Sequence, residues 1–496
     1  MDYLAIDLGA SSGRIIVVSK TNDIMLNEIR RFQIQTIEID NEHAILKLDE
    51  LINNITLGIK EAFHQYPYIV SIGIDTWGVD YGYVDQDGYI ENPYFYRSLR
   101  TKPVIHEVYD ICSKNHLYQL TGIQNQYFNT IYQMYADKLS DKPYKNIKKA
   151  LLLPDLIAYI LTGEMRLELT NLSTTGLYNP IKRELIQDID QLTFGKGKFA
   201  KIIYPTEVYG MLKASFGYPH IPVVAVCTHD TASAIVSLPL QDTDIYISSG
   251  SWSLLGILLK EPCINEQAQQ LNFTNEVGFN HDIRFLKNIN GLFIANHVMK
   301  LFKKRGKPLT FELIYQEVQK VQPFKSLIDV NHHIFDNPLN MIEAIQSYCL
   351  QTKQYVPKTI GEIFRTIYES LALKYAIEIE GIYKITQQVY QHIYIFGGGG
   401  QINFINQLLA DLTSLEVIQG PKEATVLGNG IVQMLANKEI TTISEGQKLI
   451  QKSFGKRVFK PMDINQTYIK KLYLEIVEKG EKNVNYRTIS NGKRKV

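Results

Sequence analysis

Residues 3–13 read YLAIDLGASSG, a buried-strand pattern that ends in a turn of glycine and small hydroxyl residues. Residues 14–19 continue as a second strand, so the segment predicts a glycine-turned hairpin. The same order returns far along the chain, where residues 244–257 read DIYISSGSWSLLGI. Any two hairpins share such features, and duplication of one fold unit explains the echo equally well. Duplication predicts two related halves with a cleft between them.

Strand and helix patterns alternate along the rest of the chain. Apolar residues recur at helical spacing from 48 to 64, with Asp49 placed to cap that helix. Residues 68–74 and 81–84 read as strands, and residues 393–396 form another strand pattern before four glycines and a helix from Asn403. This alternation predicts an α/β protein.

Length and composition limit the possible classes of protein. The chain has 496 residues, which at roughly 150 residues per domain predicts two to four domains. Apolar residues make up 45% and charged residues 21%, which excludes disordered, collagen-like and disulfide-scaffold proteins. The net charge of +1 argues against nucleic-acid or anionic membrane partners. The four cysteines form neither a CxxC pair nor a Cys/His cluster, so no zinc site is predicted.

Targeting signals are not expected. Acidic residues, Asp2 and Asp7, occupy the region where a signal peptide needs basic residues. The longest apolar segment, 150–161, is interrupted by Pro154 and Asp155 and is shorter than the ~20 residues that span a bilayer. The basic tail at 491–495 favours a solvated end over a nucleic-acid contact. A cytoplasmic protein with a small-molecule partner and no membrane partner is therefore expected.

The first hairpin turn has the character of a phosphate-binding loop. Small residues from Ala10 to Gly13 let backbone N–H groups approach a phosphate, and Arg14 adds a fixed positive charge. Asp7 could hold Mg²⁺ directly or through water. The alternative interpretation is a tight hairpin with a surface arginine. A second glycine site, 397–400, brings backbone close to a flat group such as adenine, or serves only a close crossing of helix and strand.

Two further segments carry chemistry. Asp230 follows a strand and opens a small-residue helix, so it is either a helix N-cap or the carboxylate that takes a proton from an attacking hydroxyl. His229 and Thr231 could then hold neighbouring sugar hydroxyls. Residues 75–80, DTWGVD, place Trp77 between carboxylates, which suits either sugar stacking or a buried core tryptophan.

The ordered set of motifs resembles the FGGY family of carbohydrate kinases over roughly residues 3–460. The matching segments are DLGASSGR at 7–14, DTWGVDY at 75–81, YR at 96–97, THDTASA at 228–234, SSGSWS at 248–253, FTNE at 273–276, FLKNI at 285–289, GGGGQ at 397–401 and EATVLGN at 423–429. The resemblance implies an α/β fold of two ribonuclease H-like domains, of the actin and hexokinase type, with a central interdomain cleft. Residues 1–244 would carry the sugar and phosphate side, residues 245–460 the adenine nucleotide side, and residues 461–496 a C-terminal extension.

The resemblance also implies a reaction and its residues. ATP, with Mg²⁺, would phosphorylate L-rhamnulose at its 1-hydroxyl to give L-rhamnulose 1-phosphate and ADP, with Asp230 as general base. The nucleotide positions would be Ala10, Ser11, Ser12, Gly13, Arg14, Ser251, Asn296 and Gly398. The ketose positions would be Gly78, His229, Asp230, Thr231 and Asn288.

Some positions depart from the family pattern, and other functions compete. Asn296 stands where Gln is usual, Ser251 where Thr is common, and Gly400 where Ser or Cys often follows three glycines, which bears on nucleotide affinity. Alternatives are a kinase for fuculose, ribulose or xylulose, and a non-catalytic sugar-sensing module. A dehydrogenase is disfavoured because no GxGxxG fingerprint is present. The sequence leaves a monomer and a homodimer equally open.

Overall fold

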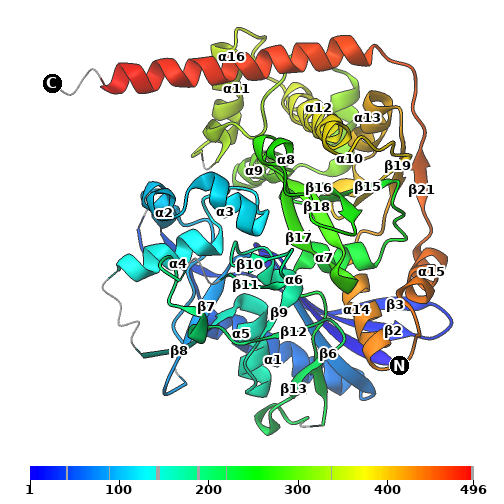
Figure 1. Cartoon of the computed structure of the whole chain (residues 1–496). Coiled ribbons are helices and arrows are strands. Elements are labelled where there is room, and N and C mark those ends of the chain that lie inside the picture. Colours follow the sequence, from blue (N-terminus) through cyan, green and yellow to red (C-terminus); the bar gives the residue numbers. More distant parts are fainter. Residues whose placement is uncertain are drawn as a thin grey trace. The chain divides into compact units, whose positions relative to one another are not determined.

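The computed structural model describes residues 1–40, 43–88, 90–140, 146–186, 190–218, 220–336 and 338–492. The chain divides into two compact units that are each discontinuous in sequence (Figure 1). Unit 1 consists of Met1–Asp242, Ile257–Leu286 and Glu423–Gly455, and unit 2 of Thr243–Gly256, Lys287–Lys422 and the residues from Lys456 onward. The contiguous domain boundaries 1–244, 245–460 and 461–496 remain a prediction.

A six-stranded sheet forms the centre of unit 1, in the order β13-β14-β6-β1-β2-β3. Its strands are β1 (Asp2–Leu8), β2 (Ser12–Lys20), β3 (Ile24–Gln33), β6 (Ile69–Thr76), β13 (Val208–Met211) and β14 (Pro222–Val224). β1 is antiparallel to β2 and parallel to β6, and β14 is parallel to β6. The carboxyl ends of β1, β6 and β14 therefore share one edge of the sheet.

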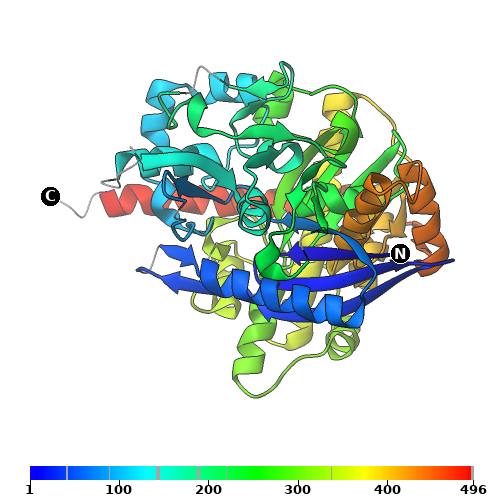
Figure 2. The ribbon, with the colours of Figure 1, turned by 90° about the horizontal axis from the view of Figure 1, so that it is seen from below.

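Both faces of this sheet are buried, because side chains alternate between two apolar clusters. Leu4 and Ile6 of β1 pack in a cluster with α1 (Leu48–Gln65), which Figure 2 shows along one face of the sheet. Tyr3 and Ala5 point to the other face, where α7 (Asp230–Val236) and α14 (Ala424–Ala436) supply the apolar partners.

The remaining elements of unit 1 surround this core. Its other helices are α2 (Ile105–Ile111), α3 (Lys114–Thr121), α4 (Thr130–Leu139), α5 (Leu153–Thr162), α6 (Leu169–Leu172), α8 (Glu266–Gln270) and α15 (Ile443–Phe454). Its other strands are β4 (Thr36–Glu38), β5 (Ala44–Leu46), β7 (Tyr81–Asp85), β8 (Ile147–Leu152), β9 (Arg166–Glu168), β10 (Tyr178–Asn179), β11 (Glu184–Leu185), β12 (Lys201–Ile203) and β17 (Thr274–Val277).

The second sheet has the order β17-β18-β16-β15-β19-β20-β21. The remaining strands are β15 (Asp244–Ser249), β16 (Trp252–Leu259), β18 (Ile283–Asn290), β19 (His392–Phe396), β20 (Glu416–Gln419) and β21 (Arg457–Phe459). β15 is antiparallel to β16 and parallel to β19, which repeats the relation of β1 to β2 and β6. The hairpin that is repeated in the sequence therefore has the same strand topology in both sheets.

Helices of unit 2 follow its strands. They are α9 (Phe293–Lys304), α10 (Phe311–Gln319), α11 (Met341–Gln351), α12 (Ile360–Thr386), α13 (Asn403–Thr413) and α16 (Gln466–Gly492). A capping box between Thr359 and Glu362 begins α12. No helix in the described ranges is long and apolar enough to cross a membrane.

Most local expectations are confirmed, and one is wrong. The hairpins, the helix over 48–64 and the strand–glycine–helix segment near 397 are all present. Asp49 is not the cap of α1, because Lys47 occupies that position without a side-chain bond. Asp49 lies in the first turn instead, where its charge favours the helix dipole. Residues 493–495 of the basic tail lie outside the described residues.

Candidate active site

Three carboxylates of unit 1 gather at the shared edge of its sheet. Asp7 and Asp75 are register partners at the ends of β1 and β6. The segment after β14 joins the same edge, where Thr76 N–H donates to the carbonyl of Thr228 at 2.8 Å. Asp230 follows two residues later. Burial, and then the charge of Asp7, raise the pKa of Asp230 to about 7.

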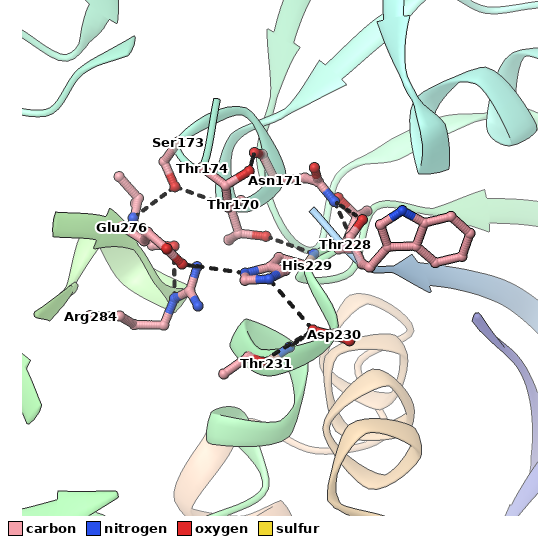
Figure 3. Close-up of polar contacts among 12 residues, drawn as sticks. Thr170, Asn171, Ser173, Thr174, Thr228, His229, Asp230, Thr231, Glu276 and Arg284 are labelled. Atoms are coloured by element: carbon pink, nitrogen blue, oxygen red, sulfur yellow. Dashed lines mark hydrogen bonds and ion pairs between the residues drawn. The ribbon is translucent and has the colours of Figure 1, made fainter. Parts of the chain in front are cut away.

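Asp230 is the first residue of α7 and holds its carboxylate in one orientation (Figure 3). The backbone N–H of Thr231 donates to Oδ1 at 2.5 Å, and the Thr231 hydroxyl donates to the same oxygen at 3.1 Å. The side chain is 33% exposed. The N-cap interpretation is wrong, because His229 occupies the cap position and makes no side-chain cap bond. Both hydrogen bonds engage Oδ1, so Oδ2 is the oxygen left for a substrate hydroxyl.

His229 connects Asp230 to a buried ion pair. Its Nε2 lies 3.5 Å from Asp230 Oδ1, and its Nδ1 lies 3.5 Å from Glu276 Oε2. Glu276 on β17 and Arg284 on β18 are direct cross-strand partners, with Nη2 of Arg284 3.1 Å from Oε2. Burial, together with the charge of Arg284, lowers the pKa of His229. A neutral imidazole therefore stands beside Asp230.

Buried Glu168 fixes the segment that carries these residues. Its Oε2 accepts hydrogen bonds from the hydroxyls of Thr170 and Thr228, both at 2.6 Å, and from Thr228 N–H at 3.1 Å. The Thr170 hydroxyl accepts a bond from His229 N–H at 3.4 Å. Loss of this carboxylate would free the backbone directly before Asp230. No motif in the sequence marked Glu168 or Arg284, and Glu276 stood unremarked within FTNE.

The segment at 75–80 supports the core interpretation of its tryptophan. Trp77 is buried, packs edge-on against Phe95, and donates from Nε1 to Asp80 Oδ2 at 2.8 Å. Its ring is thus part of the core rather than a sugar-stacking surface. Gly78 lies where a Cβ would meet Thr174 Oγ1 at 2.9 Å. Val79 has a φ of 71°, a strained conformation for a β-branched residue.

The predicted phosphate loop connects β1 to β2. Gly9 N–H donates to the Ser12 carbonyl at 3.0 Å, and the loop exposes Ser11. A Cβ on Gly13 would lie 2.4 Å from the Phe32 ring, so packing requires this glycine whatever the loop binds. Arg14 is not a surface arginine: its guanidinium bridges Asp7 and Glu423 with only 18% of the side chain exposed.

Two of the three nucleotide positions of unit 2 lie just after the ends of neighbouring strands, and the third lies on a helix. Ser251 follows β15 and Gly398 follows the neighbouring parallel strand β19. The Ser251 carbonyl accepts a bond from Phe293 N–H at 3.2 Å, which joins it to the start of α9, the helix of Asn296. Ser251, Asn296 and Gly398 are all exposed. A Cβ on Gly399 would lie 2.0 Å from Ser249 Oγ, so the glycine run packs directly against β15.

Asn288 lies on β18 in unit 2, whereas the other predicted ketose residues belong to unit 1. The described residues include no group of three or more His, Cys, Asp or Glu arranged to hold a metal ion. Oδ1 of Asp75, next to Asp7, is buried and has no hydrogen-bond partner in the part of the chain that the structure describes. Mg²⁺ commonly uses one or two carboxylates plus waters and substrate phosphates. The residues at this edge therefore fit Mg²⁺ carried on phosphates and held through water.

Comparisons with known proteins agree with this geometry. Two family models match, the N-terminal domain of the FGGY family of carbohydrate kinases at residues 2–237 and its C-terminal domain at residues 245–437. The chain is 38% identical over 491 residues to a rhamnulokinase of Bacillus subtilis (strain 168), covering 97% of this chain and 99% of that protein. It is 40% identical over 462 residues to a rhamnulokinase of Halalkalibacterium halodurans, covering 92% and 98%.

Solved structures share the fold. A xylulose kinase from Lactobacillus acidophilus superposes with a TM-score of 0.80 at 14% identity, with 99% of each chain covered. Plasmodium falciparum glycerol kinase with ADP gives 0.77 at 14% identity, with 97% of this chain and 98% of that chain covered. These neighbours confirm the predicted α/β fold of actin and hexokinase type. On its family models and its relatives, the chain belongs to the FGGY family of carbohydrate kinases.

Proposed function

We propose that the protein is an ATP-dependent kinase that phosphorylates L-rhamnulose at the 1-hydroxyl. The observation that carries the proposal is the placement of Asp230, with Oδ1 held by Thr231 and Oδ2 in no hydrogen bond with the described residues. Its relatives at 38% and 40% identity bear the name rhamnulokinase. Other ketoses remain the alternative that a substrate comparison would separate, because one differently placed hydroxyl decides among them.

Asp230 would act as general base. Its Oδ2 would take the proton of the 1-hydroxyl as that oxygen attacks the γ-phosphorus of ATP. The bond from this phosphorus to the oxygen it shares with the β-phosphate breaks, and ADP leaves. A pKa of about 7 suits proton transfer near neutral pH. Gly78, His229, Thr231 and Asn288 would contact the ketose.

The nucleotide-binding residues would be those that the family resemblance implies. Ala10, Ser11, Ser12, Gly13 and Arg14 would face the phosphates, and Ser251, Asn296 and Gly398 would face the rest of ATP. Mg²⁺, held by Asp7 through water, would supply charge neutralisation of the phosphates when bound. Cytoplasmic location, the interdomain cleft and a monomeric or homodimeric state belong to the same proposal.

An ADP-release assay with L-rhamnulose, L-fuculose, L-ribulose and D-xylulose tests the proposal. L-rhamnulose should give the highest kcat/KM, and preference for another ketose would overturn the substrate. Asp230→Asn should lower kcat by at least roughly 10²-fold while ketose binding persists. Near-normal turnover of that variant would remove Asp230 as the base. ATP and sugar binding without ADP release by the native enzyme would favour a sensing module.

A further inference from the structure

His229 stands between two carboxylates that compete for one proton. Its Nε2 faces Asp230 Oδ1 and its Nδ1 faces Glu276 Oε2, each at 3.5 Å (Figure 3). The side chain is only 9% exposed, and the imidazole is neutral. A neutral imidazole carries a single N–H, so it can donate to only one of the two carboxylates.

Arg284 decides which carboxylate receives that N–H. Its guanidinium is fully buried and 3.1 Å from Glu276 Oε2. A guanidinium stays charged in proteins, and a buried one requires an anion beside it. Glu276 is therefore the carboxylate held in its charged form. Asp230 makes no ion pair with Arg284 among the described residues: burial and the negative charge of Asp7 raise its pKa, and the charge of Arg284 lowers it.

We propose that Glu276 and Arg284 are positioning residues that hold His229 as the tautomer protonated on Nδ1, with the Nε2 lone pair facing Asp230 and the substrate. The kinetic part of this inference rests on the proposed function. Nδ1 of His229 and Oε2 of Glu276 are buried without a hydrogen-bond partner among the described residues, and a proton on Nδ1 would give both atoms one by a small approach from 3.5 Å. Nε2 would accept a hydrogen bond from a sugar hydroxyl next to the reacting one.

This tautomer also keeps Asp230 basic. An Nε2–H donated to the Asp230 carboxylate would stabilise its charged form and weaken it as a base. A lone pair at Nε2 disfavours the charged form of the Asp230 carboxylate and so keeps its pKa raised. The charged groups near His229 and Asp230 are Glu276 on β17, Arg284 on β18, Asp7 on β1 and Asp75 on β6.

Nitrogen NMR of the ligand-free protein tests the tautomer directly. In protein labelled with ¹⁵N-histidine, the His229 signals are those lost in His229→Asn. Nδ1 should show the shift of a protonated ring nitrogen, and Nε2 the shift of a nitrogen with a free lone pair. The opposite pattern in the native protein would overturn the inference, and no variant needs to fold for that result except the one used for assignment.

A double variant tests the cause. Glu276→Met with Arg284→Met removes the acceptor and its counter-ion together, so neither charge is left buried and unpaired. The proton should then move to Nε2, where Asp230 is the remaining carboxylate. The matched control is the double variant Lys260→Ala with Asp282→Ala. These two residues form an ion pair of 2.9 Å, Lys260 is exposed, and Asp282 directly precedes β18, the strand of Arg284. An unchanged tautomer in the Met pair would show that Glu276 and Arg284 only support the fold.

Kinetics give the second readout. In the Met pair, kcat/KM for the ketose should fall on the order of 10-fold, because Nε2 no longer accepts the hydrogen bond of the sugar hydroxyl. Removing Arg284 also removes a charge that lowers the pKa of Asp230, so an acid limb that nevertheless moves to lower pH would show that the new Nε2–H stabilises charged Asp230. The control pair should keep the native profile. If the protein shows the predicted tautomer but phosphorylates no ketose, only the proposed function is overturned. If it is an active kinase with the reverse tautomer, only this inference is overturned.

Discussion

Asn429 donates a hydrogen bond of 2.6 Å from Nδ2 to Oδ2 of Asp75, although the two residues are 354 positions apart in the chain. The bond continues into a buried series. Gln433 Nε2 donates to Asn429 Oδ1 at 2.7 Å, and Ser71 Oγ donates to Gln433 Oε1 at 2.7 Å. A helix from late in the sequence thereby fixes the carboxylate at the end of β6.

Asn429→Ala should destabilise unit 1. It leaves a fully buried carboxylate oxygen of Asp75 without its donor, at a cost of about 1–3 kcal/mol. Chemical denaturation followed by fluorescence measures the loss. Asn53→Ala, at an exposed position on α1, is the matched control and should stay within about 0.5 kcal/mol of the native protein. Equal stability of the two variants would contradict the role of this bond.

The Asp230→Asn variant should be more stable than the native protein at pH 8. The pKa of Asp230 rises from an ordinary value of 3.8 to about 7 on folding. Between pH 3.8 and about 7 the folded chain binds more protons at this carboxylate than the unfolded chain does. The free energy of unfolding therefore falls as the pH rises. An amide removes this effect. The difference in Tm between variant and native protein should therefore shrink from pH 8 to pH 5, and a constant difference would contradict the prediction.

Gly428→Ala should separate α14 from α7. A Cβ at Gly428 would lie 1.7 Å from the backbone oxygen of Ser233, so the helices cannot keep their contact. We expect a loss of at least about 2 kcal/mol and reduced turnover, because α7 begins with Asp230. Gly197→Ala, which meets nothing within 4 Å, serves as the control. Native Tm and kcat in Gly428→Ala would refute the close crossing.

Arg14→Lys should weaken ATP binding. Arg14 bridges Asp7 and Glu423 through different nitrogens, which a single ammonium cannot reproduce. These carboxylates hold the guanidinium at the loop proposed to face the ATP phosphates, and loss of one charge-assisted hydrogen bond to a phosphate, ~1.5 kcal/mol, corresponds to roughly a 10-fold higher KM for ATP. The control is Arg31→Lys, since Arg31 is the cross-strand neighbour of Arg14 but pairs with Glu28 at the surface. An unchanged KM for ATP would exclude this role.

Local patterns were sufficient to predict the strands and the glycine turns, because each depends on residues close in sequence. The role of Asp230 as general base comes from the family resemblance and stays a prediction. The alternatives for single residues were decided only by the three-dimensional structure. Trp77 is a core residue because of neighbours supplied by other segments, whereas Asp230 is not a cap because α7 begins at Asp230 itself, with His229 in the cap position.

The tertiary partners could not be predicted. Glu276 reaches Arg284 through the register of β17 with β18, and Glu168 reaches Thr228 from an element 60 positions away. Single-sequence periodicity carries no information on such pairing. The same reason explains why the discontinuous unit 1 was not foreseen, since α14 and α15 follow the second sheet in the chain.

Because α14 lies late in the sequence, unit 1 can fold completely only after most of the chain has been translated. During translation, β1 and β2 emerge first, yet the apolar face that contains Tyr3, Ala5 and Val18 has only α7 as a partner among the described helices until residues 424–436 have left the ribosome. A nascent chain that stops earlier would expose this face and leave Asp75 without its amide partner. Premature termination anywhere before Glu423 therefore yields a fragment with exposed apolar surface rather than a folded N-terminal half. Such a fragment is a substrate for chaperones and proteases.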